Sequence, residues 1–188
     1  LCVGEVRLRD GRLDADTHRG FPTPWVAFTH FTGLERVFPK SRLFGGYFLR
    51  YKNLRTTHDI DLWTSHFMLT RKKIFEEVGY WDEDFFVYGE DVDLCWRVKK
   101  AGWRIVFVPG AKVVHYKGVS VGIRAETRDI TKATRETKKK MILETTQAML
   151  KFYRKHYKGK VYTPFILLGI RTLSFFRSLK VRLGHFDE

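Results

Sequence analysis

The alternation of hydrophobic and polar positions predicts an α/β fold for this chain. Runs of large apolar residues bounded by turn residues are typical of strands, and they occupy residues 3–8, 59–70, 103–108 and 112–116. Apolar positions three or four residues apart are typical of helices, and they occupy residues 25–34, 71–78, 90–101, 130–157 and a last segment after Pro164. Residues 35–57 have no clean period, so we expect a long loop there, and long ordered loops often carry function.

Composition and charge separate the chain into two parts. Of its 188 residues 44% are hydrophobic, enough for the core of one domain, and its two cysteines, Cys2 and Cys95, do not indicate a disulfide framework. The net charge of +14 is uneven, because residues 132–183 contain 14 Lys and Arg but only two Asp and Glu. Residues 1–131 are nearly balanced. The basic tail therefore favours a polyanion or an anionic membrane surface as a partner.

Carboxylates gather just before and within the helix predicted over residues 90–101. Glu90 and Asp91 fall in its first turn, directly after Gly89, and Asp93 follows. Acids are common at this place because free backbone N–H groups and the helix dipole stabilise negative charge. The same setting also suits chemistry, since a carboxylate held by N–H donors stays ionised and can accept a proton from a hydroxyl group.

Three blocks of sequence carry a resemblance to a known family. They are LWTSHFMLTRKKIFEEVGYWDEDFF at 62–86, YGEDVDLCWRVKKAGWRIVFVP at 88–109 and AKVVHYKG at 111–118. In this order and spacing they resemble the second half of family 2 glycosyltransferases with the GT-A fold, especially bacterial rhamnosyltransferase-like members. The resemblance implies that residues 1–125 form the acceptor-binding part of a GT-A domain, with a mixed sheet and flanking helices. Residues 126–188 would then be a basic, amphipathic helical tail.

The resemblance also implies roles for the acids of the second block. Asp91, the second residue of the Glu-Asp pair, would be the catalytic base that deprotonates the acceptor hydroxyl. Glu90 would position the acceptor or the sugar, and Asp93 would orient groups at the start of the helix. The reaction would invert the anomeric configuration of the transferred sugar.

Four further residues stand at positions around the substrates, and three of them match the family pattern. Trp63 and Ser65 match the segment that lines the sugar pocket. His66 stands where a glycine is usual in the family, which changes the expected shape of that pocket. His115 matches a histidine that reaches the metal or the diphosphate in some members, although a single histidine at a strand end is more often structural.

The donor-binding half of such an active site is not among the motifs of this chain. Family members hold a nucleotide diphosphate-sugar with Mg²⁺ or Mn²⁺ bound to an Asp-x-Asp motif that ends an apolar strand. Asp-x-Asp triplets start at Asp14, Asp59 and Asp91, but none of these follows an apolar strand. We therefore interpret the chain as a fragment that lacks the metal-binding motif, and we expect it to transfer no sugar alone.

The partners implied are a nucleotide-sugar donor, a glycan or lipid-linked acceptor in cell-surface polysaccharide synthesis, and an anionic membrane surface bound by residues 132–183. This places the protein in the cytoplasm, peripherally on the inner face of the membrane. The apolar run 165–170 is far shorter than the ~20 residues needed to span a bilayer. The alternatives are a solvated basic surface or a non-catalytic membrane- or nucleic-acid-binding module. Nucleic acid is disfavoured because no RNA- or DNA-binding motif is visible.

Overall fold

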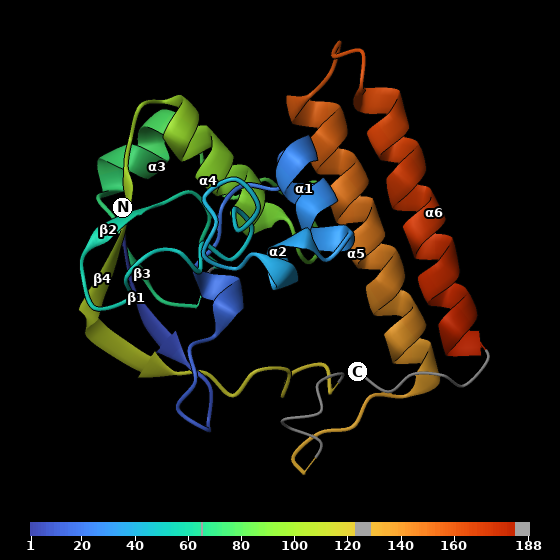
Figure 1. The fold of residues 1–188 in the computed structure, drawn as a ribbon, viewed down its shortest axis with the longest axis horizontal. Coiled ribbons are helices and arrows are strands. Elements are labelled where there is room, and N and C mark those ends of the chain that lie inside the picture. Colours follow the sequence, from blue (N-terminus) through green and yellow to red (C-terminus); the bar gives the residue numbers. More distant parts are fainter. Residues whose placement is uncertain (65, 123–128, 183–188) are drawn as a thin grey trace. The chain divides into compact units, whose positions relative to one another are not determined.

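The computed structural model describes residues 1–64, 66–122 and 129–182 and has a mixed α/β architecture (Figure 1). Its strands are β1 (Cys2–Arg7), β2 (His58–Ile60), β3 (Met68–Leu69) and β4 (Ile105–Val114). Its helices are the 3-10 turn η1 (Ala15–Thr17), α1 (Pro24–Phe31), α2 (Leu34–Val37), α3 (Lys72–Val78), α4 (Glu90–Lys100), α5 (Arg135–His156) and α6 (Thr163–Arg182). The α/β prediction is confirmed, and the architecture is consistent with part of a GT-A fold.

The strands form a four-stranded mixed sheet in the order β2-β4-β1-β3. β1 and β4 are parallel neighbours at the centre, while β2 and β3 are antiparallel edge strands. The core beside the sheet contains Val3, Trp63, Leu94 and Phe107 among other buried side chains. Helix α4 contributes its buried face, which includes Cys95 and Val98, to this core.

The prediction of one strand over residues 59–70 is wrong. β2 and β3 occupy the two ends of that segment and lie at opposite edges of the sheet. One continuous strand cannot pair at both edges, so the described residues between β2 and β3, 61–64 and 66–67, leave the ladder and cross from one edge to the other. This crossing contains Trp63 and His66, which the sequence analysis had placed in a strand.

The two predicted strands around Pro109 are a single strand, β4. Gly4 of β1 is opposite Val108, and the next residue, Glu5, is opposite Lys112. Residues 109–111 therefore form an irregularity through which pairing continues, so Pro109 does not end the strand. A bulge can contain a proline because the residue at that position does not need to donate a backbone hydrogen bond to the neighbouring strand.

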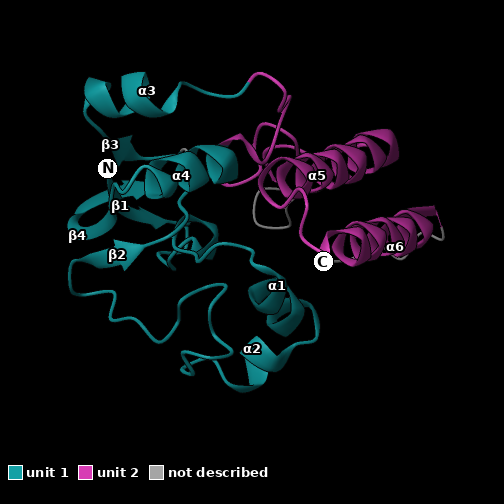
Figure 2. Cartoon of the chain, turned by 90° about the horizontal axis from the view of Figure 1, so that it is seen from above, with its two compact units in different colours: residues 1–82, 91–115 teal, residues 83–90, 116–188 magenta. Residues whose placement is uncertain are grey.

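The chain forms two compact units (Figure 2). The first contains residues 1–82 and 91–115, with the sheet and helices α1 to α4 apart from Glu90. The second contains residues 83–90 and 116–188. These divisions differ from the boundary expected at residue 125, and the domain assignment itself stays a prediction.

Helices α5 and α6 make up most of the second unit and lie side by side (Figures 1 and 2). The hydroxyl of Thr146 on α5 donates a 2.8 Å hydrogen bond to that of Ser174 on α6. Ile170 and Val181 are the buried apolar residues of α6. Both predicted tail helices are confirmed. Among the residues described, no helix is long and apolar enough to cross a membrane.

Candidate active site

The candidate base, Asp91, lies in the first turn of α4, as the sequence predicted. Its residue surface is 8% exposed, so the carboxylate is largely withdrawn from water but not sealed. Its Oδ1 accepts a 2.8 Å hydrogen bond from the backbone N–H of Val92. Negative charge at this place is stabilised by the helix N-terminus.

The backbone that leads into α4 is strained. Tyr88 has a φ of 64° and Gly89 a φ of 87°, so two left-handed residues precede Glu90. This conformation is rare for a bulky residue such as tyrosine. At Gly89 a Cβ would also lie 3.0 Å from Ala148 and from Phe85, so glycine is required there. Strain of this kind gathers at functional sites, where it fixes the direction of a following side chain.

Glu90 and Asp93 lie in different surroundings. The Oε2 atom of Glu90 is buried and, among the residues described, has no hydrogen-bond partner. Asp93 is completely buried and accepts a 2.7 Å hydrogen bond from Nε of Arg97, four residues later. Arg97 also donates to the carbonyl oxygens of Val78 and Gly79 at the end of α3. Asp93 thus ties α4 to α3, and its role toward a ligand stays a prediction.

Trp63 is completely buried within the core. Its Nε1 has no hydrogen-bond partner among the described residues, and its backbone oxygen accepts from the Cys95 thiol at 3.7 Å. Burial raises the pKa of Cys95 well above its usual value, so this thiol is neutral and not a nucleophile. Trp63 lies beneath the surface, and its contact with a sugar stays a prediction. Ser65 lies outside the described residues.

A second polar cluster contains His66 and His115. The ring centroids of the two histidines are 3.9 Å apart, and Nδ1 of His66 is 2.7 Å from Oγ1 of Thr64. Nδ1 of His115 is 2.8 Å from Oδ2 of the buried Asp14. A carboxylate bound to one ring nitrogen fixes the orientation of the ring and directs the other nitrogen outward.

This cluster has the position expected of a ligand site in a parallel sheet. Asp14 follows β1 and His115 follows β4, which are parallel neighbours. The carboxyl ends of such strands are where ligands bind in open α/β sheets. In the sequence, Asp14 was considered only as part of an Asp-x-Asp triplet. Its contact with His115 joins residues 101 positions apart, and no local sequence pattern predicts such a contact.

The described residues do not form a site for a hard divalent cation. Among them no group of three or more histidine, cysteine or acidic side chains is placed to hold a metal ion. Mg²⁺ and Mn²⁺ prefer several oxygen ligands, whereas His66 and His115 offer nitrogen. The Asp59-Ile60-Asp61 triplet is engaged in ion pairs, because Asp59 pairs with Arg104 and Asp61 with Lys99.

Comparison with protein families decides the assignment of the chain. The family model described as "Glycosyl transferase family group 2" matches residues 22–180, which is most of the length of this chain. The chain belongs to this family. The match includes the crossing at Trp63, the Glu-Asp pair at the start of α4 and His115, so the resemblance found in the sequence is confirmed at the level of the family.

Individual family 2 relatives are similar over short stretches. One is "N-acetylglucosaminyl-diphospho-decaprenol L-rhamnosyltransferase" of Mycobacterium tuberculosis (strain CDC 1551 / Oshkosh), 51% identical over 29% of this chain and 18% of the relative. Another is "Rhamnosyltransferase WbbL" of Escherichia coli (strain K12), 40% identical over 30% of this chain and 22% of the relative. A third is "O-antigen biosynthesis protein RfbC" of Myxococcus xanthus, 35% identical over 30% of this chain and 4% of the relative.

The matched stretch is thus at most about a fifth of the length of the two rhamnosyltransferases. No solved structure shows significant similarity to the chain.

Proposed function

We propose that this chain supplies the acceptor side of an inverting glycosyltransferase, in which Asp91 is the catalytic base. The observation that carries the proposal is the position of Asp91. It is a largely buried carboxylate in the first turn of α4, after a strained turn, in a chain of glycosyl transferase family group 2. A positioned carboxylate is suited to accept the proton of an attacking hydroxyl group.

In the proposed reaction, Asp91 accepts the proton of the acceptor hydroxyl while the hydroxyl oxygen bonds to the anomeric carbon of the donor sugar. The bond to the nucleotide diphosphate breaks on the opposite face, so the anomeric configuration inverts. A carboxylate is a weak base, and it suffices when the proton moves late in the displacement. Holding the two substrates in line supplies much of the rate.

The substrate class that we propose comes from the family and its relatives. Two of the relatives described above are named as rhamnosyltransferases and a third as an O-antigen biosynthesis protein. We therefore propose a nucleotide diphosphate-sugar as donor, a lipid-linked or glycan acceptor, and a role in making cell-surface polysaccharide. A divalent cation, Mg²⁺ or Mn²⁺, would neutralise the charge of the leaving diphosphate.

The configuration of the product tests the inverting mechanism. We expect the intact protein to convert an α-linked nucleotide-sugar donor into a β-linked product, because a single base and direct attack from the opposite face allow no other outcome. Proton NMR of the product, read within the first few per cent of turnover, reports the configuration of the new bond. Retention of the donor configuration would refute direct displacement with Asp91 as base.

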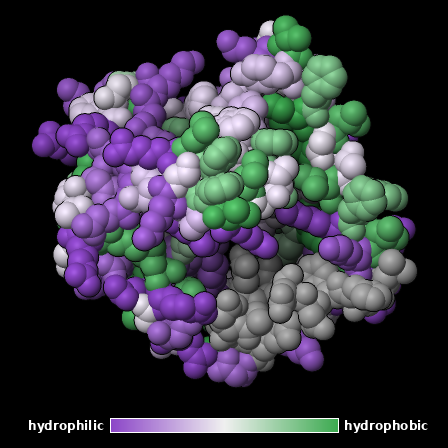
Figure 3. All heavy atoms as spheres, viewed as in Figure 1, coloured by the Kyte–Doolittle hydropathy of each residue, from purple (hydrophilic) through white to green (hydrophobic). Residues whose placement is uncertain are grey.

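A peripheral membrane position is supported by the outer face of α6. Phe165, Leu168, Phe175, Phe176 and Leu179 recur at helical spacing and are exposed, whereas Ile170 and Val181, on the other side, are buried. Hydrophobic residues gather over α6 in the space-filling view (Figure 3). Arg171 and Lys180 flank this apolar face in the helical projection. A helix with an apolar face and basic flanks is suited to lie in the headgroup region of an anionic bilayer.

Vesicle binding tests this second proposal. We expect the double variant Phe165→Ser/Phe175→Ser to bind anionic phospholipid vesicles about tenfold more weakly than the unchanged protein, because each buried aromatic ring contributes to binding. Co-sedimentation measures the effect. A matched control is Val37→Ser/Leu69→Ser, which changes two exposed apolar residues far from the tail in sequence. Equal vesicle binding by the two variants would contradict the proposal that α6 binds the membrane surface. Binding to DNA in place of vesicles would favour the nucleic-acid alternative.

A further inference from the structure

Arg19 has its backbone fixed beside the candidate active site. Its N–H donates to the carbonyl oxygen of Leu62 at 3.1 Å, and the N–H of Leu62 donates back at 2.9 Å. This antiparallel bridge places Arg19 next to the segment that contains Trp63. Arg19 belongs to the same compact unit as Asp91.

The guanidinium group of Arg19 uses few of its hydrogen-bond donors. Nη1 donates to the hydroxyl of Tyr47 at 2.9 Å. Nε is buried and has no partner among the described residues, and none of the ion pairs found there includes Arg19. Among the described residues Nη2 also makes no hydrogen bond. Charged groups withdrawn from water are nearly always paired, which makes this arrangement unusual.

Neighbouring groups keep Arg19 charged. Burial acts against the charge, but Tyr47, Asp16 and Asp91 outweigh it, so the pKa of Arg19 is raised above its usual value. Arg19 is therefore a cation in the same compact unit as the candidate base. Such a cation can attract an anionic group toward the carboxylate that would act on the substrate.

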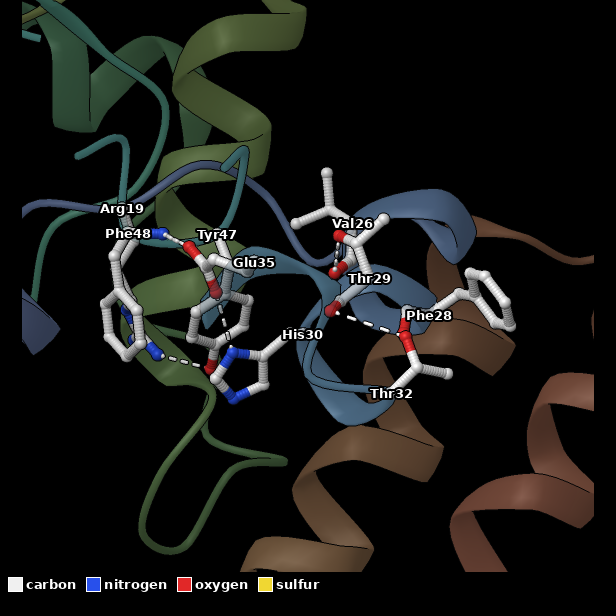
Figure 4. A network of polar contacts seen from close by, with 9 residues as sticks. All are labelled: Arg19, Val26, Phe28, Thr29, His30, Thr32, Glu35, Tyr47 and Phe48. Carbon is white, nitrogen blue, oxygen red and sulfur yellow. Dashed lines mark hydrogen bonds and ion pairs between the residues drawn. The ribbon is translucent and has the colours of Figure 1, made fainter. Parts of the chain in front are cut away.

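A polar network holds the partner of Arg19 in place (Figure 4). The ring of Tyr47 stacks on His30 with centroids 3.9 Å apart, and the Arg19 guanidinium lies 5.4 Å from the centroid of the same tyrosine ring. Nδ1 of His30 is 2.9 Å from Oε2 of Glu35, and Oε1 of Glu35 accepts from the backbone N–H of Phe48 at 2.7 Å. Glu35 is buried, so the network is part of the fold and not a surface contact.

We propose that Arg19 is an anion-binding residue that contacts a phosphate or diphosphate group beside Asp91, and that Tyr47 is its positioning residue. Guanidinium binds phosphate through two parallel N–H groups, and the Nε and Nη2 pair of Arg19 has no hydrogen-bond partner among the described residues. This inference rests on the proposed function, because a nucleotide-sugar donor and a lipid-diphosphate acceptor both carry that chemistry.

Binding of inorganic pyrophosphate to the intact protein, measured by isothermal titration calorimetry, tests the proposal. We expect Arg19→Gln to lower the affinity at least about tenfold, since a charge-assisted contact is lost. The affinity of Arg19→Lys should lie between that of Arg19→Gln and that of the unchanged protein, because lysine keeps the charge but lacks the two parallel N–H groups. Tyr47→Phe should weaken binding severalfold with the charge intact. Arg50→Gln removes an exposed arginine from the same segment and should leave the affinity unchanged.

An unchanged affinity in Arg19→Gln, or no binding of pyrophosphate by the unchanged protein, would overturn the proposal. If Arg19→Gln fails to fold, Arg19→Lys and Tyr47→Phe decide, and wild-type affinity in both overturns it. Uridine diphosphate and geranyl diphosphate distinguish the two sources, because the one whose affinity depends on Arg19 identifies the substrate that carries the phosphate. Asp91→Asn should bind pyrophosphate as the unchanged protein does. Full transfer activity in that variant would contradict the role of Asp91 as base but would leave the proposal for Arg19 unaffected.

Discussion

Replacement of Asp91 by asparagine is expected to lower turnover by about 10²- to 10⁴-fold, the usual contribution of a positioned general base. The amide has the size of the carboxylate but cannot accept the proton of the acceptor hydroxyl. Its oxygen can still accept the hydrogen bond from the N–H of Val92, so the start of α4 should be preserved. Initial rates of sugar transfer by the intact protein, beside its thermal unfolding curve, measure the two effects separately.

The control for this variant is Glu83→Gln, which neutralises an exposed acid a few residues before α4. It changes the net charge by the same amount and should leave turnover close to that of the unchanged protein. Turnover in Asp91→Asn within a few-fold of the control would remove Asp91 from the role of base. Loss of the cooperative unfolding transition in Asp91→Asn would instead show that the carboxylate maintains the fold.

The candidate base could be found from sequence because its signals are local. Gly89 before the helix, acids in its first turn and Gly102 after it define α4 within one residue of its observed ends. Gly102 has a φ of 85°, as expected of a glycine that ends a helix. The blocks that resemble family 2 glycosyltransferases surround the same helix, so local physics and resemblance agree on Asp91.

The rest of the site could not be found in this way because it depends on distant contacts. Asp14 reaches His115 only because β1 and β4 pair as parallel neighbours, and a pairing partner is not encoded in either strand alone. Arg19 was overlooked for the same reason, since its bridge to Leu62 and its bond to Tyr47 join three separate segments. Trp63 had an expected position at a sugar pocket, but its complete burial depends on how the crossing segment packs.

Replacement of Asp93 by alanine is expected to lower the free energy of unfolding by about 3–5 kcal/mol, because it leaves the largely buried guanidinium of Arg97 without its carboxylate partner. Asp93 is 0% exposed and Arg97 only 18% exposed in their side chains. Arg97 also binds the carbonyl oxygens at the end of α3, so loss of its anchor should loosen the packing of α3 on α4. Urea unfolding of the 188-residue chain measures the change.

The matched control is the exposed ion pair between Lys72 and Glu76 on α3, which has the same spacing of four residues in a helix. Its side chains are 82% and 51% exposed, so Glu76→Ala should cost no more than about 0.5 kcal/mol. Because both pairs have the same spacing, the difference between them isolates the effect of burial. A loss in Asp93→Ala no greater than that in Glu76→Ala would show that Asp93 is dispensable for the fold. Its completely buried carboxylate would then need another explanation, and a direct part in the chemistry beside Asp91 would be the one to test.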